Sequence, residues 1–257
     1  MMRNNLSETW QRPTALPHAN LIGGGRCRLQ DCSLIAEADH RIANHLALLA
    51  GHVRLRAIDL NRRPDASGPD AIRLLLMAVE AEIAAVARLH RKLSRGSARA
   101  PADLADELHE VCAPFGSGLS GNVVVIENFE AGCTVTADQI LPLTQIITEV
   151  ITNALKHAYA DSRGGLLIAR LRRVGPALAL VEIVDHGPGF PKTFNIATDG
   201  GLGFRVVRAL AEQLQATASF ASSGEGVRFK LTLPLPVIGL SAQADLRAEP
   251  AGGHQMS

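Results

Sequence analysis

The sequence has no long apolar run: none approaches the roughly 18 residues that a membrane span requires. It also has no excess of charge of one sign, since 26 basic residues face 25 acidic ones and the formal net charge is +1. That balance argues against a nucleic-acid coat or a polybasic membrane binder as the main role. The opening segment, MMRNNLSETWQRP, has no apolar core and no cleavage-like pattern of small residues, so we expect no secretory signal.

Cysteine is scarce, and its spacing does not indicate a metal site. The four cysteines form no CxxC pair and have no histidine at zinc-site spacing: Cys27, Cys32, Cys112 and Cys133. Reduced thiols in the cytosol are the simplest interpretation. We therefore expect a cytoplasmic protein with no membrane span and no nucleic-acid partner.

Composition divides the chain into four segments. Residues 1–30 are polar, contain two prolines and reach a Gly23–Gly25 run, and we expect them to be poorly ordered. A helical region covers 31–97 and dissolves into RGSARAP, after which a mixed domain covers 101–236. Residues 237–257 are rich in alanine, glycine and polar residues and are expected to form a flexible tail.

Heptad spacing predicts a helical hairpin in the first half. Ile35, Ile42 and Leu49 recur every seven residues, and a polar stretch with prolines and glycine then stops the helix. The second helix carries an apolar seam of about three heptads: Ile72, Leu76, Val79, Ile83, Val86, His90 and Leu93. Two such helices leave apolar surface uncovered, so we expect a second copy to complete a homodimeric four-helix bundle.

The second half alternates helical and extended patterns, which predicts an α+β fold with one layer of helices on a mixed sheet. The expected strands cover 122–128, 132–137, 166–174, 177–186 and 227–235. The expected helices cover 103–113, 138–159 and 203–215.

His40 occupies the exposed face of the first helix. With Ile42 as reference, its position lies about 160° around the helical wheel from the apolar stripe. Glu37, three residues earlier, is placed to hold one ring nitrogen and leave the other as a nucleophile. Asp39 is an alternative acid that points to a different face, and an ordinary surface histidine is the structural alternative.

Three further patterns follow in the second half. Glu149, Asn153 and Lys156 form a polar line on an otherwise apolar helix, which suits a metal–phosphate site. Next, DHGPGF places Asp185 at a strand end before Gly187 and Gly189, where the backbone can approach a ligand. Ten residues on, DGGLGFRVV leads into a helix whose free N–H groups can receive phosphate oxygens. Neither glycine segment has Walker or Rossmann spacing.

The order of these patterns resembles the ATP-binding domain of the GHKL superfamily. In that resemblance EVITNALKHAY is the N box, DHGPGF the G1 box and GGLGF the G2 box. Upstream, EADHRIANHLALL resembles the phosphoacceptor box of HWE-like bacterial sensor histidine kinases, and the likeness covers roughly residues 33–235. The acceptor box departs from the family pattern, with Ala43 in place of a lysine and His45 in place of a small polar residue.

The resemblance implies a histidine autokinase with ATP and Mg²⁺ as cofactors. His40 would be the phosphorylated histidine, Glu149 the acid of the N box, and Asn153 the Mg²⁺ ligand. Lys156 and His157 would sit near the phosphates. Asp185 would bind adenine, and Gly187 and Gly189 would shape that wall of the site. Gly201 and Gly203 would form the phosphate-side turn.

The same resemblance implies partners. Phosphate would pass to an aspartate of a response-regulator receiver domain, and regulation would come from a separate sensor or upstream protein, because 1–30 is too short for a sensor fold. The main alternative is a non-catalytic phosphotransfer adaptor with a vestigial ATP domain, and a second is a GHKL regulator such as an anti-sigma-type serine kinase. The intact boxes disfavour the adaptor, and the hairpin with His40 disfavours the regulator.

Overall fold

The structure is a computed structural model that describes residues 43–58, 68–94, 101–117, 123–159 and 165–236. His40 and Glu37 therefore lie outside the described residues. The first described element is a helix over residues 43–58. The labelled helices are α2 (Pro69–Ser94), α3 (Leu104–Ser117), α4 (Ala137–His157), α5 (Ile196–Asp199) and α6 (Leu202–Gln213). The strands are β1 (Ala102–Asp103), β2 (Val123–Phe129), β3 (Thr134–Val135), β4 (Gly165–Gly175), β5 (Leu178–Asp185), β6 (Thr217–Ser223) and β7 (Gly226–Pro234).

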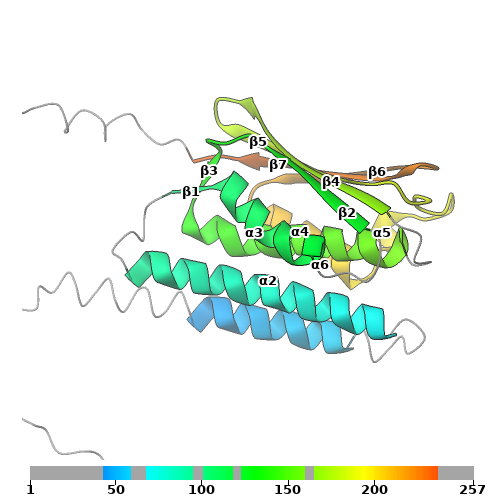
Figure 1. The fold of residues 1–257 in the computed structure, drawn as a ribbon, viewed down its shortest axis with the longest axis horizontal. Helices are drawn as coiled ribbons and strands as arrows, with labels where there is room; N and C mark the ends of the chain where they lie inside the picture. The colour runs from blue at the N-terminus through cyan, green and yellow to red at the C-terminus, as the bar shows by residue number, and fades with distance from the viewer. Residues whose placement is uncertain (1–42, 59–67, 95–100, 118–122, 160–164, 237–257) are drawn as a thin grey trace, which may run out of the picture.

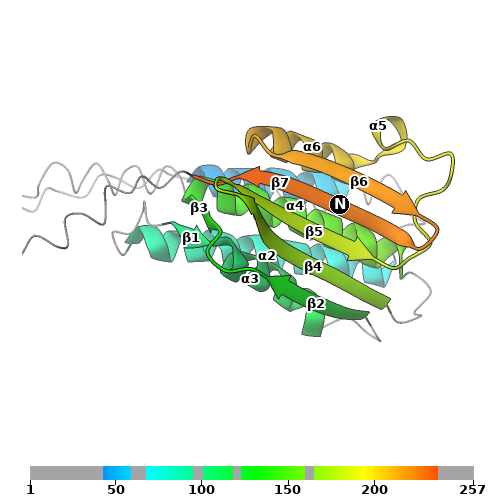
Figure 2. The same cartoon turned by 90° about the horizontal axis from the view of Figure 1, so that it is seen from above.

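The fold is α+β, as expected, with a mixed five-stranded sheet in the order β2-β4-β5-β7-β6. β2 pairs parallel with β4, and all the other neighbours in this sheet are antiparallel. β1 and β3 form a separate two-stranded antiparallel pair. Figure 2 shows the helices gathered on one face of the sheet, as the sequence predicts.

Two strands differ from the expectation. The expected strand over 132–137 is only the two-residue β3, because Thr136 is already the N-cap of α4. The Thr136 side chain accepts from the Gln139 backbone N–H, and the Gln139 side chain accepts from the Thr136 backbone N–H. β6 was not predicted at all. Its sequence, TASFASS, has small residues and only one large apolar side chain, so its periodicity is weak. It forms because it pairs with β7 as an edge strand.

α4 is the central helix of the fold. Every residue from 140 to 151 is buried, including the polar Thr144, Gln145, Thr148 and Glu149. The helix is enclosed because the sheet lies on one side of it and α2 on the other (Figure 1). Thr148 meets part of its polar demand by donating from its hydroxyl to the Thr144 carbonyl at 2.6 Å.

The helical hairpin docks on the mixed domain and shares its core. One face of α2 is buried with α4 and the sheet in a single apolar cluster, to which α2 contributes Leu74, Met77, Ala85, Val86 and Leu89. Within one chain, most described residues of the predicted heptad seam do not belong to this buried face. Ile72, Leu76 and Ile83 are 47%, 63% and 52% exposed.

No helix among the described ranges is long and apolar enough to cross a membrane.

Candidate nucleotide-binding site

A cavity of about 510 Å³ lies between the C-terminal half of α4, the end of β5 and the start of α6. Its volume falls in the range of small-molecule sites, about 300–1,000 Å³. Seven of the sequence-predicted site residues line it: Asn153, Lys156, His157, Asp185, Gly189, Gly201 and Gly203. The fold thus brings the three glycine- and asparagine-bearing patterns together around one space.

The N-terminal part of the polar line on α4 is locked in place. Glu149 is 1% exposed, and its Oε1 accepts from Asn153 Nδ2 at 3.2 Å, one turn along the helix. Gly203 packs against the same carboxylate: a Cβ there would collide with Glu149 Oε1. Asn153 lines the cavity, whereas Glu149 lies behind it and contacts Asn153.

Asp185 ends β5 and fixes the turn that follows it. Its side chain is held by two backbone donors, since Oδ1 accepts from Gly187 N at 3.0 Å and from Val227 N at 3.1 Å. The residue is only 7% exposed and faces the cavity. Gly187 is required because a Cβ would collide with Ala158 at the end of α4. Gly189 adopts φ +73° against the Ser223 carbonyl, a conformation that favours glycine.

The turn is braced by Tyr159, which lies two residues past the end of α4. The Tyr159 hydroxyl donates to the Leu166 carbonyl at 2.6 Å and accepts from His186 N at 2.9 Å. Burial, with the charge of Asp185 beside it, raises the pKa of the Tyr159 hydroxyl, so the group stays a neutral donor. Asp199 also lines the cavity, and the backbone N–H of Asn195 and the Thr198 hydroxyl donate to its carboxylate, which lowers the pKa of that carboxyl.

A cluster of phenylalanines forms the apolar wall, and the sequence analysis did not predict it. Phe190, Phe194 and Phe204 pack on one another with ring centroids 4.9–5.9 Å apart. Phe220 and Phe229 continue the cluster into the sheet, at 5.0 Å and 4.9 Å. The sequence holds seven phenylalanines, and their separation along the chain hides this grouping. An aromatic and apolar wall beside a few convergent polar groups is typical of a site for a planar ligand.

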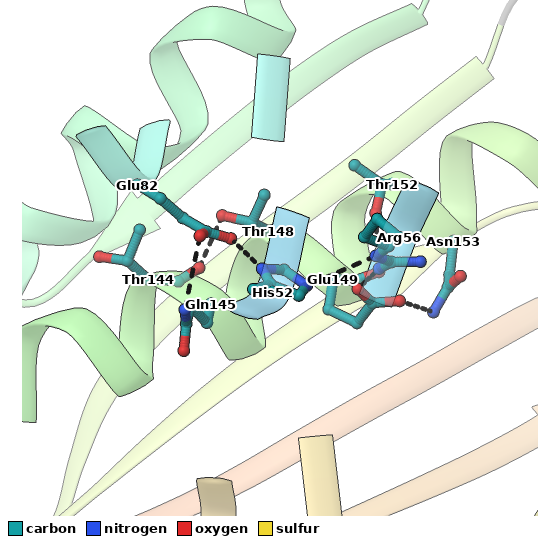
Figure 3. Close-up of polar contacts among 9 residues, drawn as sticks. All are labelled: His52, Arg56, Glu82, Thr144, Gln145, Thr148, Glu149, Thr152 and Asn153. Atoms are coloured by element: carbon teal, nitrogen blue, oxygen red, sulfur yellow. Dashed lines mark hydrogen bonds and ion pairs between the residues drawn. The ribbon is translucent and has the colours of Figure 1, made fainter. Parts of the chain in front are cut away.

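The hairpin also contributes to the cavity, which the sequence analysis missed. Arg56 from the first helix lines it, together with four residues of α2: Ala71, Leu74, Leu75 and Ala78. Figure 3 shows Arg56 pointing at Glu149 beside Asn153, and the guanidinium forms an ion pair with Glu149 Oε2. No sequence signal separates this arginine from others on the same helix.

The arrangement provides acceptors, cations and close backbone approach, but no preassembled metal cluster. Within the part of the chain that the structure describes, no group of three or more His, Cys, Asp or Glu side chains is placed to hold a metal.

Comparison with known proteins agrees with this geometry. Residues 138–237 match the family described as histidine kinase-, DNA gyrase B- and HSP90-like ATPases. Across 212 residues, or 78% of this chain, the sequence is 26% identical to blue-light-activated histidine kinase 2 of Erythrobacter litoralis. The chain is thus similar to bacterial sensor histidine kinases, and its second half matches this ATPase family.

Two further relatives extend the match. The sensor histidine kinase PdtaS of Mycobacterium tuberculosis is 29% identical over 72% of this chain. The solved histidine kinase domain of the Erythrobacter litoralis EL346 blue-light-activated kinase superposes with a TM-score of 0.58 at 25% identity, covering 84% of this chain and 95% of that one. The chain spans 57% of the length of the first curated relative and 36% of the second.

Proposed function

We propose that this chain is a histidine autokinase of a two-component system, with ATP bound in the cavity between α4, β5 and α6. The observation that supports it is the convergence of Asn153, Asp185 and the Gly201–Gly203 turn on one cavity with an aromatic wall. The proposal assigns residues 31–97 to the dimerisation and acceptor hairpin and residues 101–236 to ATP binding. Residues 1–30 and 237–257 are assigned to flanking segments.

The polar end of β5 suits the adenine ring. The two backbone N–H groups that donate to the Asp185 side chain both bind Oδ1, and this oxygen fixes the turn. We assign the remaining acceptor capacity of the carboxylate to the exocyclic amine of adenine. Gly187 and Gly189 keep the adjoining backbone close, and the phenylalanine cluster supplies an apolar surface for the ring.

Other residues of the cavity lining suit the triphosphate. Lys156 and His157 line it from α4, and Gly201 caps α6, whose first N–H groups have no partner within the helix. The side-chain oxygen of Asn153 fits a single protein ligand of Mg²⁺, which commonly binds one or two protein groups plus substrate phosphates. When bound, the ion would neutralise charge on the phosphates.

The proposed reaction forms a bond between a ring nitrogen of His40 and the γ-phosphorus of ATP and breaks the bond to the β–γ bridging oxygen, so ADP leaves. The phosphoryl group then passes to an aspartate carboxylate of a response-regulator receiver domain. Glu37 is assigned to orient His40, and Glu149 is assigned as the acid of the N box. Positioning and charge neutralisation supply most of the catalysis in such transfers.

We further propose that the chain acts in the cytoplasm, where ATP and receiver domains are available, under the control of a separate sensor or upstream protein. The exposed apolar residues of the hairpin support a homodimer. They lie on both helices: Leu46, Leu48, Leu55, Ile58, Ile72, Leu76 and Ile83. Large apolar side chains left exposed on both helices of the hairpin favour an interaction site there.

The test is incorporation of phosphate from γ-labelled Mg-ATP into the purified chain, alongside His40→Ala and Asn153→Ala. We expect label that is acid-labile and base-stable in the wild type, and a loss of at least about 100-fold in both variants. Nucleotide binding should persist in His40→Ala, because that residue is assigned to accept phosphate and not to bind ATP.

An unlabelled wild type with no nucleotide binding would contradict the autokinase and favour a phosphotransfer adaptor. Label that persists in His40→Ala would contradict the assigned acceptor.

A further inference from the structure

Two carboxylates are buried where the hairpin meets the mixed domain. Glu82 of α2 is fully buried, and Glu149 of α4 is 1% exposed. A carboxylate removed from water is tolerated only when hydrogen bonds or an opposite charge compensate for its lost hydration. Their partners therefore determine how the hairpin is held.

Both partners come from the first helix, one turn apart. His52 Nδ1 contacts Glu82 Oε1 at 2.7 Å, and four residues later Arg56 forms the ion pair with Glu149. The chain of contacts is continuous, because Arg56 Nε donates to His52 Nε2 at 3.4 Å and Gln145 of α4 donates to Glu82 at 3.4 Å (Figure 3). The His52–Glu82 contact joins the two helices of the hairpin, whereas Arg56 contacts Glu149 on α4, the proposed catalytic helix.

We propose that Arg56 is a latch that holds the hairpin against α4 in the nucleotide-free chain and keeps Glu149 occupied until the hairpin is released. The inference rests on the proposed function, because it gives Arg56 control over a residue assigned to phosphoryl transfer. Arg56 acts through Glu149 and is thus a positioning residue.

The register of the first helix indicates that the latched arrangement is a resting one. Residues 43–58 form one continuous helix, so the Cα of Ala43 lies about 20 Å from that of Arg56 at 1.5 Å per residue. Arg56, which contacts Glu149, follows the assigned acceptor His40 by sixteen residues in the sequence. Under the proposed function the acceptor histidine has to reach this cavity, and the latch proposal is that Arg56 leaves Glu149 when it does.

The latch is testable by hydrogen exchange on the full nucleotide-free chain. In Arg56→Ala we expect amides of residues 43–58 to exchange about tenfold faster, while amides of β5 and β7 stay protected as an internal reference. Arg54→Ala is the matched control, since Arg54 is an exposed arginine on the same helix. Arg56→Lys keeps the charge and should retain most of the protection. Unchanged exchange in Arg56→Ala would overturn the latch.

Autophosphorylation separates a latch from a phosphate ligand. A latch predicts that Arg56→Ala incorporates label from Mg-ATP at least threefold faster than the wild type, with Arg54→Ala unchanged. Slower labelling in Arg56→Ala would overturn the proposal and make Arg56 a contact to the nucleotide. If no variant takes up label, the proposed function fails, and the exchange result alone decides whether Arg56 holds the hairpin.

Discussion

At the scale of single residues, the cavity depends on glycines at positions where any side chain would collide with α4 or the residue that caps it. Gly203 packs on the Glu149 carboxylate, and Gly187 packs on Ala158. The absent Cβ thus lets α6 and the β5 turn approach α4 closely. This explains why the glycine segments point to the site although neither has the spacing of a known phosphate loop.

Replacing Gly203 with alanine should strain this contact. The new methyl group would meet Glu149 Oε1, which cannot move away because Asn153 and Arg56 hold the carboxylate in a buried position. We expect the free energy of unfolding in urea to fall by about 1–3 kcal/mol, as for other overpacked sites.

Gly116→Ala is the matched control, since a Cβ at Gly116 of α3 has open space around it and alanine favours a helix. Equal stability of Gly203→Ala and the wild type would show that α6 does not bear on Glu149.

At the scale of elements, α2 has two apolar faces, one buried and one exposed. One face is buried on α4, and the other carries Ile72, Leu76 and Ile83 at 47–63% exposure. Heptad spacing identified the exposed face as a seam, and this face is the one that a second chain would cover. The same spacing did not separate the face against α4, because one predicted seam residue, Val86, is buried there and the alanines at 78, 81 and 85 contribute weakly to an apolar pattern.

We expect Leu76→Asp to convert the chain from a dimer to a monomer. Leu76 is the most exposed of these three residues at 63%, and a charge there would be costly to bury in a four-helix interface. Sedimentation velocity measures the change. Arg91→Asp, at another exposed position on α2, should leave the dimer intact. A wild type that sediments as a monomer at high micromolar concentration would refute the homodimer.

At the scale of the whole molecule, the order of motifs was enough to predict the α+β fold and the convergence of Asn153, Asp185 and Gly203. Each of these residues follows a local rule: a polar line on a helix, a turn after a strand, a glycine before a helix. The contribution of Arg56 and the phenylalanine cluster could not be predicted in this way. They reach the cavity only through tertiary packing, in which α2 and α6 contact α4 and β6 contacts α6.

The central claim is that this cavity binds ATP, and calorimetric titration of the full chain with Mg²⁺ and a non-hydrolysable ATP analogue tests it most directly. We predict binding by the wild type and at least a tenfold weaker affinity in Asp185→Asn, because hydrogen bonds to a charged acceptor contribute about 1.5–3 kcal/mol. Glu182→Gln is the control, as Glu182 lies on the same strand but faces Lys230 at 3.7 Å on the opposite side of the sheet. No binding by the wild type, or equal affinity in Asp185→Asn, would contradict the claim.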